Sequence, residues 1–144
     1  MNNRKTLDGQ TAIVTGAGQG LGEALAARLF RVGCRVVVAD INYEAAKKVS
    51  RSLAGSSIAV KVDVCNEPEV EEMVAAAVDT YGSLDLLISN AGILIAKPLV
   101  EFSAEEWRKV IDINLTGYFL CAKAAAKAMI PKRKGNIIQI NSKS

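Results

Sequence analysis

The sequence predicts an α/β fold in which helices cover both faces of a doubly wound parallel β-sheet. Short apolar segments alternate along the chain with longer segments of helical periodicity. Strands separated by helix-length segments indicate βαβ units, in which consecutive strands run parallel. The strand-like segments are apolar almost throughout, as expected of strands buried on both faces. We therefore expect a three-layer αβα domain.

The first half of the chain contains three predicted strands and two predicted helices. They are a strand at 11–15, a helix at 21–32, a strand at 35–40, a helix at 43–53 and a strand at 58–62. Leu21, Leu25 and Leu29 recur at four-residue spacing and mark one face of the first helix.

The second half continues the alternation. It contains a predicted helix at 67–81, a strand at 84–89, helical sequence at 103–129 with a bend near 114–117, and a strand at 135–140. Asn66 with Glu69, and Ser103 with Glu106, have the spacing of helix-starting capping boxes. No helix follows the last strand before Ser144, so we expect that strand to form an exposed apolar edge. The sheet is therefore predicted to be incomplete on its C-terminal side.

Composition indicates one soluble globular domain spanning residues 1–144, of which 50% are hydrophobic and 23% charged. No apolar run reaches the length of a membrane span, and the N-terminus lacks the apolar core of a signal peptide. We expect a cytoplasmic protein with no membrane partner. Cys34, Cys65 and Cys121 lack metal-ligand or redox spacing and are interpreted as buried thiols. Histidine is absent, which excludes a Ser-His-Asp triad within this chain, and no metal site is predicted.

Basic residues dominate the last third of the chain. Lys123, Lys127, Lys132, Arg133, Lys134 and Lys143 follow Asp112, and no acidic residue does. A nucleic-acid surface is one interpretation. A solvated helix face and loop is the preferred one, because the few aromatic residues do not interleave with these charges. We therefore expect no nucleic-acid partner.

A glycine-rich turn lies directly between the first predicted strand and the first predicted helix. It reads Thr-Gly-Ala-Gly-Gln-Gly-Leu-Gly over residues 15–22. Glycines allow a tight turn and let a pyrophosphate approach the backbone, while the helix N-terminus supplies free N–H groups. A strand before the turn and a helix after it are the context that a dinucleotide-binding turn requires.

The spacing of Gly16, Gly20 and Gly22 resembles the Thr-Gly-x3-Gly-x-Gly fingerprint of the classical short-chain dehydrogenase/reductase family. The resemblance implies a Rossmann-type NAD-binding domain over residues 1–144 and an oxidoreductase activity on a secondary alcohol or ketone. It assigns cofactor contacts in this turn to Thr15, Gly16, Gly18, Gln19, Gly20, Leu21 and Gly22.

Asp40 ends the second predicted strand, where a carboxylate can accept hydrogen bonds from the adenosine ribose and repel a 2′-phosphate. Ile41 follows instead of arginine, and Gln19 stands in the turn instead of a basic residue. These residues favour NAD as the cofactor over NADP.

Two later segments extend the resemblance. Asp63-Val64 follows the third predicted strand, at the place where family members contact the adenine ring. The run Ser89-Asn90-Ala91-Gly92 resembles the family's Asn-Asn-Ala-Gly, which lines the cofactor at the end of a central strand. Asp63, Val64, Asn90, Ala91 and Gly92 are therefore further candidate cofactor residues.

The resemblance also supplies two catalytic candidates. Asn114 matches the Asn of the family's catalytic tetrad, whose backbone helps to hold a water in a proton relay. Ser142 matches the catalytic Ser, which would orient and polarise the substrate oxygen, and Ser144 is its rival.

The rest of the family's tetrad, a Tyr-x3-Lys motif, is expected about a dozen residues after the Ser. Tyr43 and Lys47 have this spacing but precede Asn114 and belong to the adenosine side, so we interpret them as surface residues. The chain therefore resembles the N-terminal part of a family domain that ends after the catalytic Ser. We expect the isolated chain to be inactive, because the Tyr that would exchange the substrate proton is missing.

The substrate is indicated only weakly. Residues 117–122 and 137–144 together resemble bacterial sorbitol-6-phosphate 2-dehydrogenases, in which Lys143 could lie near an anionic substrate or face solvent. A 3-oxoacyl-thioester reductase is the alternative within the family, and a non-catalytic NAD-binding module is the alternative outside it. The resemblance implies a small-molecule alcohol or ketone substrate, and a homo-oligomer for a full-length protein.

Overall fold

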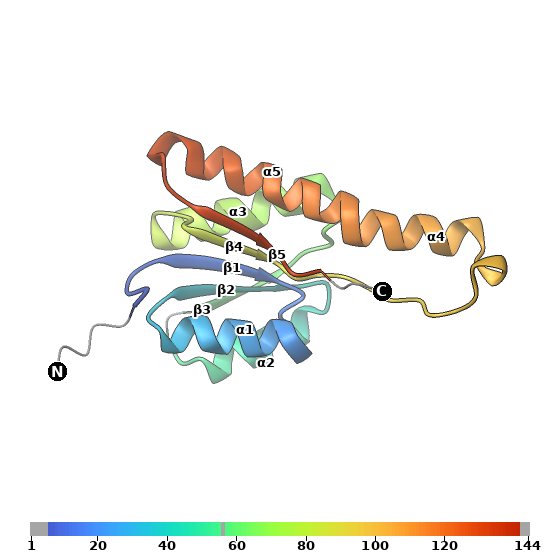
Figure 1. Ribbon diagram of the computed structural model, residues 1–144. Coiled ribbons are helices and arrows are strands. Elements are labelled where there is room, and N and C mark those ends of the chain that lie inside the picture. Colours follow the sequence, from blue (N-terminus) through green and yellow to red (C-terminus); the bar gives the residue numbers. More distant parts are fainter. Residues whose placement is uncertain (1–5, 56, 142–144) are drawn as a thin grey trace.

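The computed structural model describes residues 6–55 and 57–141, which form a five-stranded parallel sheet between two layers of helices (Figure 1). The strand order is β3-β2-β1-β4-β5, and each neighbouring pair is parallel. In Figure 1, α1 and α2 lie on one face of the sheet, and α3 and α5 lie on the other. The predicted doubly wound α/β fold of Rossmann type is confirmed.

The elements follow the predicted order, and no end of a strand or helix is shifted from its predicted position by more than two residues. The strands are β1 (Thr11–Thr15), β2 (Arg35–Asp40), β3 (Ser57–Lys61), β4 (Leu86–Ser89) and β5 (Asn136–Gln139). The helices are α1 (Gly20–Arg31), α2 (Tyr43–Ser52), α3 (Glu67–Tyr81), α4 (Ala104–Ile111) and α5 (Gly117–Met129). Short 3₁₀ turns cover Leu99–Glu101 and Ile130–Lys132.

The core has two halves, one on each face of the sheet. Ile13 and Leu87 belong to the half that packs under α3 and α5, and Val14 and Val38 belong to the half that packs under α1 and α2. Every residue of β1 is fully buried. Apolar burial on both faces is the main stabilising contribution to such a sheet, and it explains the uninterrupted apolar strands.

The order of the strands reverses direction between β1 and β4. From β1 the chain moves outward to β2 and β3, then returns to the other side of β1 for β4 and β5. The loops after β1 and β4 therefore diverge at their carboxyl ends and leave a crevice. In open α/β sheets, ligands bind at this switch point.

The helical segment 103–129 is interrupted by one π-helical turn, Asp112–Thr116, between α4 and α5. The expected bend near 114–117 thus takes the form of a π-turn, a feature often found at functional sites. Gly117 follows it at a close contact, since a Cβ there would lie 2.7 Å from Cγ2 of Val64. The start of α5 therefore packs closely against the loop that follows β3.

Helix starts agree with the predicted capping residues, with one difference. Ser103 and Glu106 form the reciprocal capping box of α4. Asn66 caps α3, but Oε2 of Glu69 accepts instead from the backbone N–H of Asp63 at 2.7 Å. Glu69 therefore ties the helix to the loop after β3.

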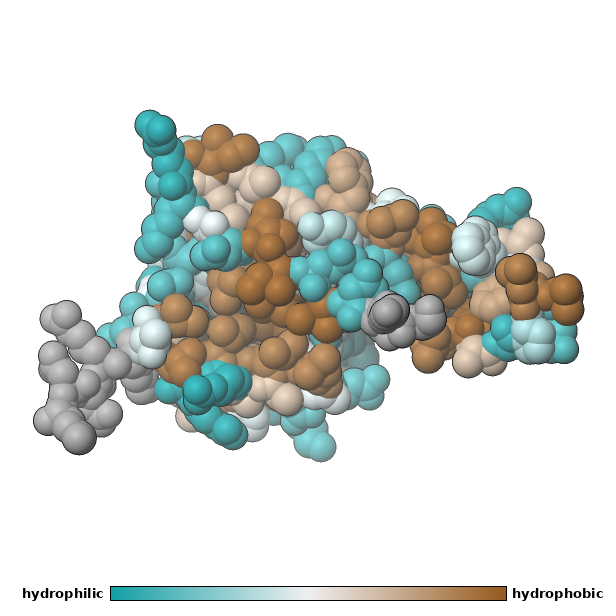
Figure 2. Space-filling view, viewed as in Figure 1, coloured by the Kyte–Doolittle hydropathy of each residue, from teal (hydrophilic) through white to brown (hydrophobic). Residues whose placement is uncertain are grey.

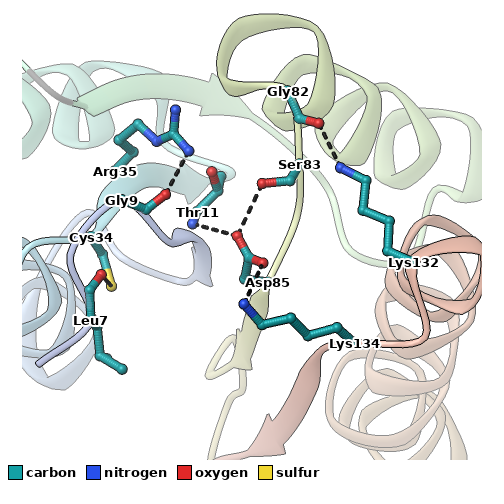
Figure 3. Close-up of polar contacts among 10 residues, drawn as sticks. All are labelled: Leu7, Gly9, Thr11, Cys34, Arg35, Gly82, Ser83, Asp85, Lys132 and Lys134. Carbon is teal, nitrogen blue, oxygen red and sulfur yellow. Dashed lines mark hydrogen bonds and ion pairs between the residues drawn. The ribbon is translucent and has the colours of Figure 1, made fainter.

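The amino-terminal edge of the sheet is held by Asp85 (Figure 3). Its Oδ2 accepts from the backbone N–H of Thr11 at 2.9 Å and from the hydroxyl of Ser83 at 3.0 Å. Lys134 lies 3.9 Å from Oδ1 of the same carboxylate. The starts of β1, β4 and β5 are fixed relative to one another through this one side chain.

Four described lysines near the C-terminus, Lys123, Lys127, Lys132 and Lys134, have partners within the chain. Lys123 and Lys127 of α5 form ion pairs with Glu67 and Glu71 of α3 at 2.6 and 3.1 Å. Lys132 donates to the carbonyl oxygen of Gly82 at 2.7 Å (Figure 3). This arrangement accords with the preferred interpretation of these charges as a solvated helix face and loop.

The last strand, β5, lies at the edge of the described sheet, as expected. Its Ile138 is 45% exposed, and apolar residues gather over the middle of the face seen in Figure 2. Within the described residues, no helix is long and apolar enough to cross a membrane.

The cysteines differ from expectation at one position. Cys34 and Cys121 are buried, and desolvation raises the pKa of the Cys121 thiol to about 12. Cys65 is exposed, so its prediction as a buried thiol is wrong. The reason is local: Cys65 follows β3 in a tight turn whose Asp63 side chain accepts its backbone N–H, and this turn directs it outward.

Candidate functional site

The glycine turn after β1 leaves no room for side chains at two of its positions. Gly16 has a φ of +62°, and a Cβ there would lie 2.9 Å from Cα of Ala91. A Cβ on Gly22 would overlap the carbonyl oxygen of Gly16 and would lie 2.6 Å from Nδ2 of Asn90. Glycine is therefore required for the first turn of α1 to pack this tightly against the end of β4.

Asn90 and Thr15 fasten the glycine turn to β4. The buried Thr15 hydroxyl accepts from the backbone N–H groups of Asn90 and Ala91 at 3.0 and 3.1 Å. The Asn90 side chain donates to the carbonyl oxygens of Thr15 and Gly16 at 3.1 and 3.2 Å. These bonds fix the relative position of the two loops that border the crevice.

Asp40 lies on the other side of the same turn. Its Oδ2 accepts from the backbone N–H of Gly18 at 2.9 Å, and its Oδ1 accepts from the backbone N–H of Asn42 at 2.8 Å. A Cβ on Gly18 would approach the carboxylate to 2.9 Å. The side chain is thus held in one orientation at the rim of the crevice, and each oxygen keeps a lone pair for a further donor.

A cavity of about 530 Å³ fills the crevice at the carboxyl ends of the strands. Its lining includes Gly16, Gln19, Gly20, Leu21, Gly22, Asp40, Ile41, Asp63, Val64, Asn90, Ala91 and Gly92. Twelve of the fourteen cofactor residues predicted from the sequence therefore meet around one space. The other two support it from behind, since Thr15 anchors the β4 loop and Gly18 anchors Asp40.

Asn114 lies in the π-turn and uses its whole side chain to hold the loop after β4. Its Oδ1 accepts from the backbone N–H of Ile93 at 2.8 Å, and its Nδ2 donates to the carbonyl oxygen of Ile93 at 2.9 Å. The backbone carbonyl oxygen of Asn114 accepts from Nε2 of Gln139 at 3.4 Å. The side chain therefore has a structural role, and the backbone carbonyl is the group that can meet a ligand.

Replacing Asn114 with alanine is expected to destabilise the chain by about 2 kcal/mol, because both backbone groups of Ile93 lose their partner. Urea unfolding followed by circular dichroism measures this change. Thr116→Ala, an exposed position in the same turn, is the control and should cost less than about 0.5 kcal/mol. Equal losses in the two variants would contradict the structural role of the Asn114 side chain.

A second cavity, of about 840 Å³, adjoins the first at Asn90, Ala91, Gly92 and Ile93. Its lining includes the polar side chains of Asn114, Gln139 and Lys97 and the aromatic rings of Phe102 and Trp107. The sequence did not predict Gln139 or Lys97 as site residues. No local pattern marks them, because their partners lie on other elements.

Two sequence predictions concern residues near the chain end. Ser142, with its rival Ser144 and with Lys143, lies outside the described residues. Asn141, the residue before Ser142, lines the second cavity.

The Tyr-x3-Lys spacing at Tyr43 and Lys47 lies on α2. Tyr43 is exposed, and Lys47 forms an ion pair with Glu44 at 2.7 Å. Neither residue lines the two cavities.

The fold and this site together define a Rossmann-type α/β protein with a nucleotide-sized cavity at the switch point of its sheet. The profile of the short chain dehydrogenase family matches residues 10–144. The chain belongs to the short-chain dehydrogenase family. Members of this family generally use NAD or NADP.

Individual relatives match nearly the whole of this chain. A 3-oxoacyl-[acyl-carrier-protein] reductase of Synechocystis sp. is 41% identical over 140 residues, and a sorbitol dehydrogenase of Cereibacter sphaeroides is 37% identical over 139. These matches cover 94% and 96% of this chain but only 57% and 54% of the relatives. A short-chain dehydrogenase/reductase crystal structure from Mycobacterium marinum superposes with a TM-score of 0.89 at 31% identity, covering 94% of this chain and 57% of that one.

Proposed function

We propose that this chain forms the NAD-binding part of an enzyme that transfers hydride between NAD and a secondary alcohol or ketone. The observation that carries the proposal is the convergence of the glycine turn, Asp40 and the Asn90 loop on one cavity. NAD would supply the hydride chemistry when bound, and the residues of this chain bind it and orient the substrate.

The cavity offers groups that each part of a dinucleotide could contact. Gly16 and Gly22 let the first turn of α1 pack against the end of β4, and a pyrophosphate could meet free N–H groups at the start of this helix. Asp40 can accept from both ribose hydroxyls, and its charge opposes a 2′-phosphate. Asp63 and Val64 would flank the adenine ring, and Ala91 and Gly92 the nicotinamide half.

The reaction would take place where the two cavities adjoin. The backbone carbonyl of Asn114 would accept a hydrogen bond from a relay water, and Ser142 would hold the substrate oxygen. We propose that a Tyr and a Lys outside this chain complete the proton transfer. The substrate class favoured by the sequence is a sugar or polyol phosphate such as sorbitol 6-phosphate.

Binding of NADH to the 144-residue chain tests the proposal. Energy transfer from Trp107, the single tryptophan, to bound NADH should appear as a saturable loss of tryptophan emission. Alcohol oxidation by this chain alone should be absent, because general acid–base catalysis contributes roughly 10²–10⁴-fold. A chain without measurable NADH binding would overturn the assignment, and alcohol oxidation by the chain alone would overturn the need for the outside Tyr and Lys.

Two other functions make different predictions. A 3-oxoacyl-thioester reductase, the activity named for the Synechocystis relative, is favoured if NADPH binds more tightly than NADH. A non-catalytic NAD-binding module is favoured if NADH binds and the chain joined to a Tyr-x3-Lys segment still oxidises no alcohol.

A further inference from the structure

The second cavity combines the catalytic candidate Asn114 with the cationic side chain of Lys97. It shares residues 90–93 with the cavity proposed for NAD. Among the residues the structure describes, Lys97 is the one charged side chain that lines it. Its volume of about 840 Å³ lies within the range of roughly 300–1,000 Å³ that is usual for small-molecule sites. A substrate that reacts beside Asn114 therefore shares its cavity with a cation.

The Lys97 side chain is held in place by an ion pair. Its Nζ lies 2.6 Å from Oε1 of Glu106, and Oε2 of Glu106 accepts from the backbone N–H of Ser103 at 2.9 Å. The hydrogen bonds from Lys97 and Ser103 lower the pKa of the Glu106 carboxyl to about 2, so the carboxylate is charged at neutral pH. Because the ammonium is already fixed, a ligand that binds it has less side-chain entropy to remove.

The positive member of this pair is the one that a bound group would meet. Glu106 does not line the cavity, whereas Lys97 does. The Nζ of Lys97 also lies 5.5 Å from the centroid of the Phe102 ring, which is part of the same lining. An ammonium group has three N–H donors, and the bond to Glu106 uses one of them. Lys97 therefore keeps donors for an acceptor inside the cavity.

We infer that Lys97 is the specificity-determining residue of this cavity and that it holds the phosphate group of a polyol phosphate. The inference rests on the proposed function. Hydrogen bonds between two charged groups are roughly twice as strong as those between neutral ones. A neutral polyol can accept from the same ammonium, but it gains no attraction between charges. Its phosphate ester gains both, while the carbon chain of either ligand can lie against the rings of Phe102 and Trp107.

Trp107 fluorescence tests the inference, because Trp107 lines the cavity and is the only tryptophan of the chain. The 144-residue chain is titrated with D-sorbitol 6-phosphate, D-sorbitol and inorganic phosphate, first by itself and then saturated with NADH. A saturable change in emission is expected with the phosphate ester. Its affinity should be at least about tenfold higher than that of sorbitol or of inorganic phosphate, since each of these lacks one of the two contacts.

The sharpest variant carries Lys97→Met together with Glu106→Gln, which removes both charges and leaves no unpaired carboxylate beside the cavity. Its preference for the phosphate ester over sorbitol should fall to within about threefold. Glu106→Gln alone preserves the capping box of α4 and the cation, and it should bind the ester at least as tightly as the unaltered chain. Lys127→Met removes a lysine from another ion pair, which lies outside this cavity. It is the matched control and should keep the preference.

The outcomes separate this inference from the proposed function. Absence of NADH binding, with the preference for the phosphate ester intact, would reject the proposed function and leave the role of Lys97 standing. Sorbitol or inorganic phosphate bound as tightly as the ester would reject the role of Lys97, whatever the result with NADH. The same holds for a chain that does not respond to the ester, and for a preference that survives in the double variant.

Discussion

Replacing Gly22 with alanine is expected to abolish NADH binding, with a loss of affinity of at least about 100-fold. The added Cβ would overlap the carbonyl oxygen of Gly16 and press on the Asn90 amide that holds that same carbonyl. The contact is with backbone, so no side-chain rotation relieves it. The turn must open, and the N–H groups that would meet the pyrophosphate lose their positions.

The variant should still fold, although overpacking of this kind costs about 1–3 kcal/mol. Circular dichroism and urea unfolding measure that cost, and loss of Trp107 emission on NADH addition measures binding. Ala24→Ser, at an exposed position on the same helix, is the control and should bind NADH normally. A folded Gly22→Ala chain with unaltered affinity would mean that the cavity is not the dinucleotide site.

Much of the fold could be predicted because its signals are local. The bounds of β1, β2 and α3 coincide with those predicted from apolar runs and capping residues. The capping box at Ser103 could also be predicted, because its two residues lie within four consecutive positions. Where strands are buried on both faces and helices carry start signals, the sequence contains most of the architecture.

The convergence of the candidate cofactor residues could also be predicted, for a topological reason. Parallel strands place the loops that follow them at one edge of the sheet, so Gly16, Asp40, Asp63 and Asn90 had to converge. The same rule does not identify which atoms meet. The bond from Asp40 to the backbone of Gly18, which fixes the rim of the cavity, emerges only from the folded chain.

The substrate side could not be predicted in this way, because its residues pair across elements. Gln139 of β5 reaches the carbonyl of Asn114, 25 residues earlier. Glu106 was predicted as a capping residue, yet its second oxygen holds Lys97. The π-turn at Asn114 has no propensity signal, since a helical sequence gives no sign of one extra residue per turn. Such features depend on packing rather than on periodicity.

The second large effect is expected at Asp40, the residue on which the proposed preference for NAD rests. Asp40→Asn removes the charge and keeps one acceptor oxygen, so one of the two N–H groups of Gly18 and Asn42 loses its partner. The ratio of NADH to NADPH affinity should fall by about 100-fold, since two unit charges about 5 Å apart repel by roughly 3 kcal/mol at an effective dielectric of about 20. Parallel titrations with NADH and NADPH measure the ratio.

Adding Ile41→Arg to this variant should move the preference further toward NADPH, because the exposed Ile41 side chain lines the same cavity and an arginine there can pair with a 2′-phosphate. Asp79→Asn, an equal change of charge on the exposed face of α3, is the control and should leave the ratio within about twofold. If the unaltered chain binds both nucleotides equally, or if Asp40→Asn lowers both affinities alike, then Asp40 orients the turn without discriminating the phosphate. In that case Asp40 gives no reason to prefer NAD over NADP. The alternative function, a 3-oxoacyl-thioester reductase, would then be better supported.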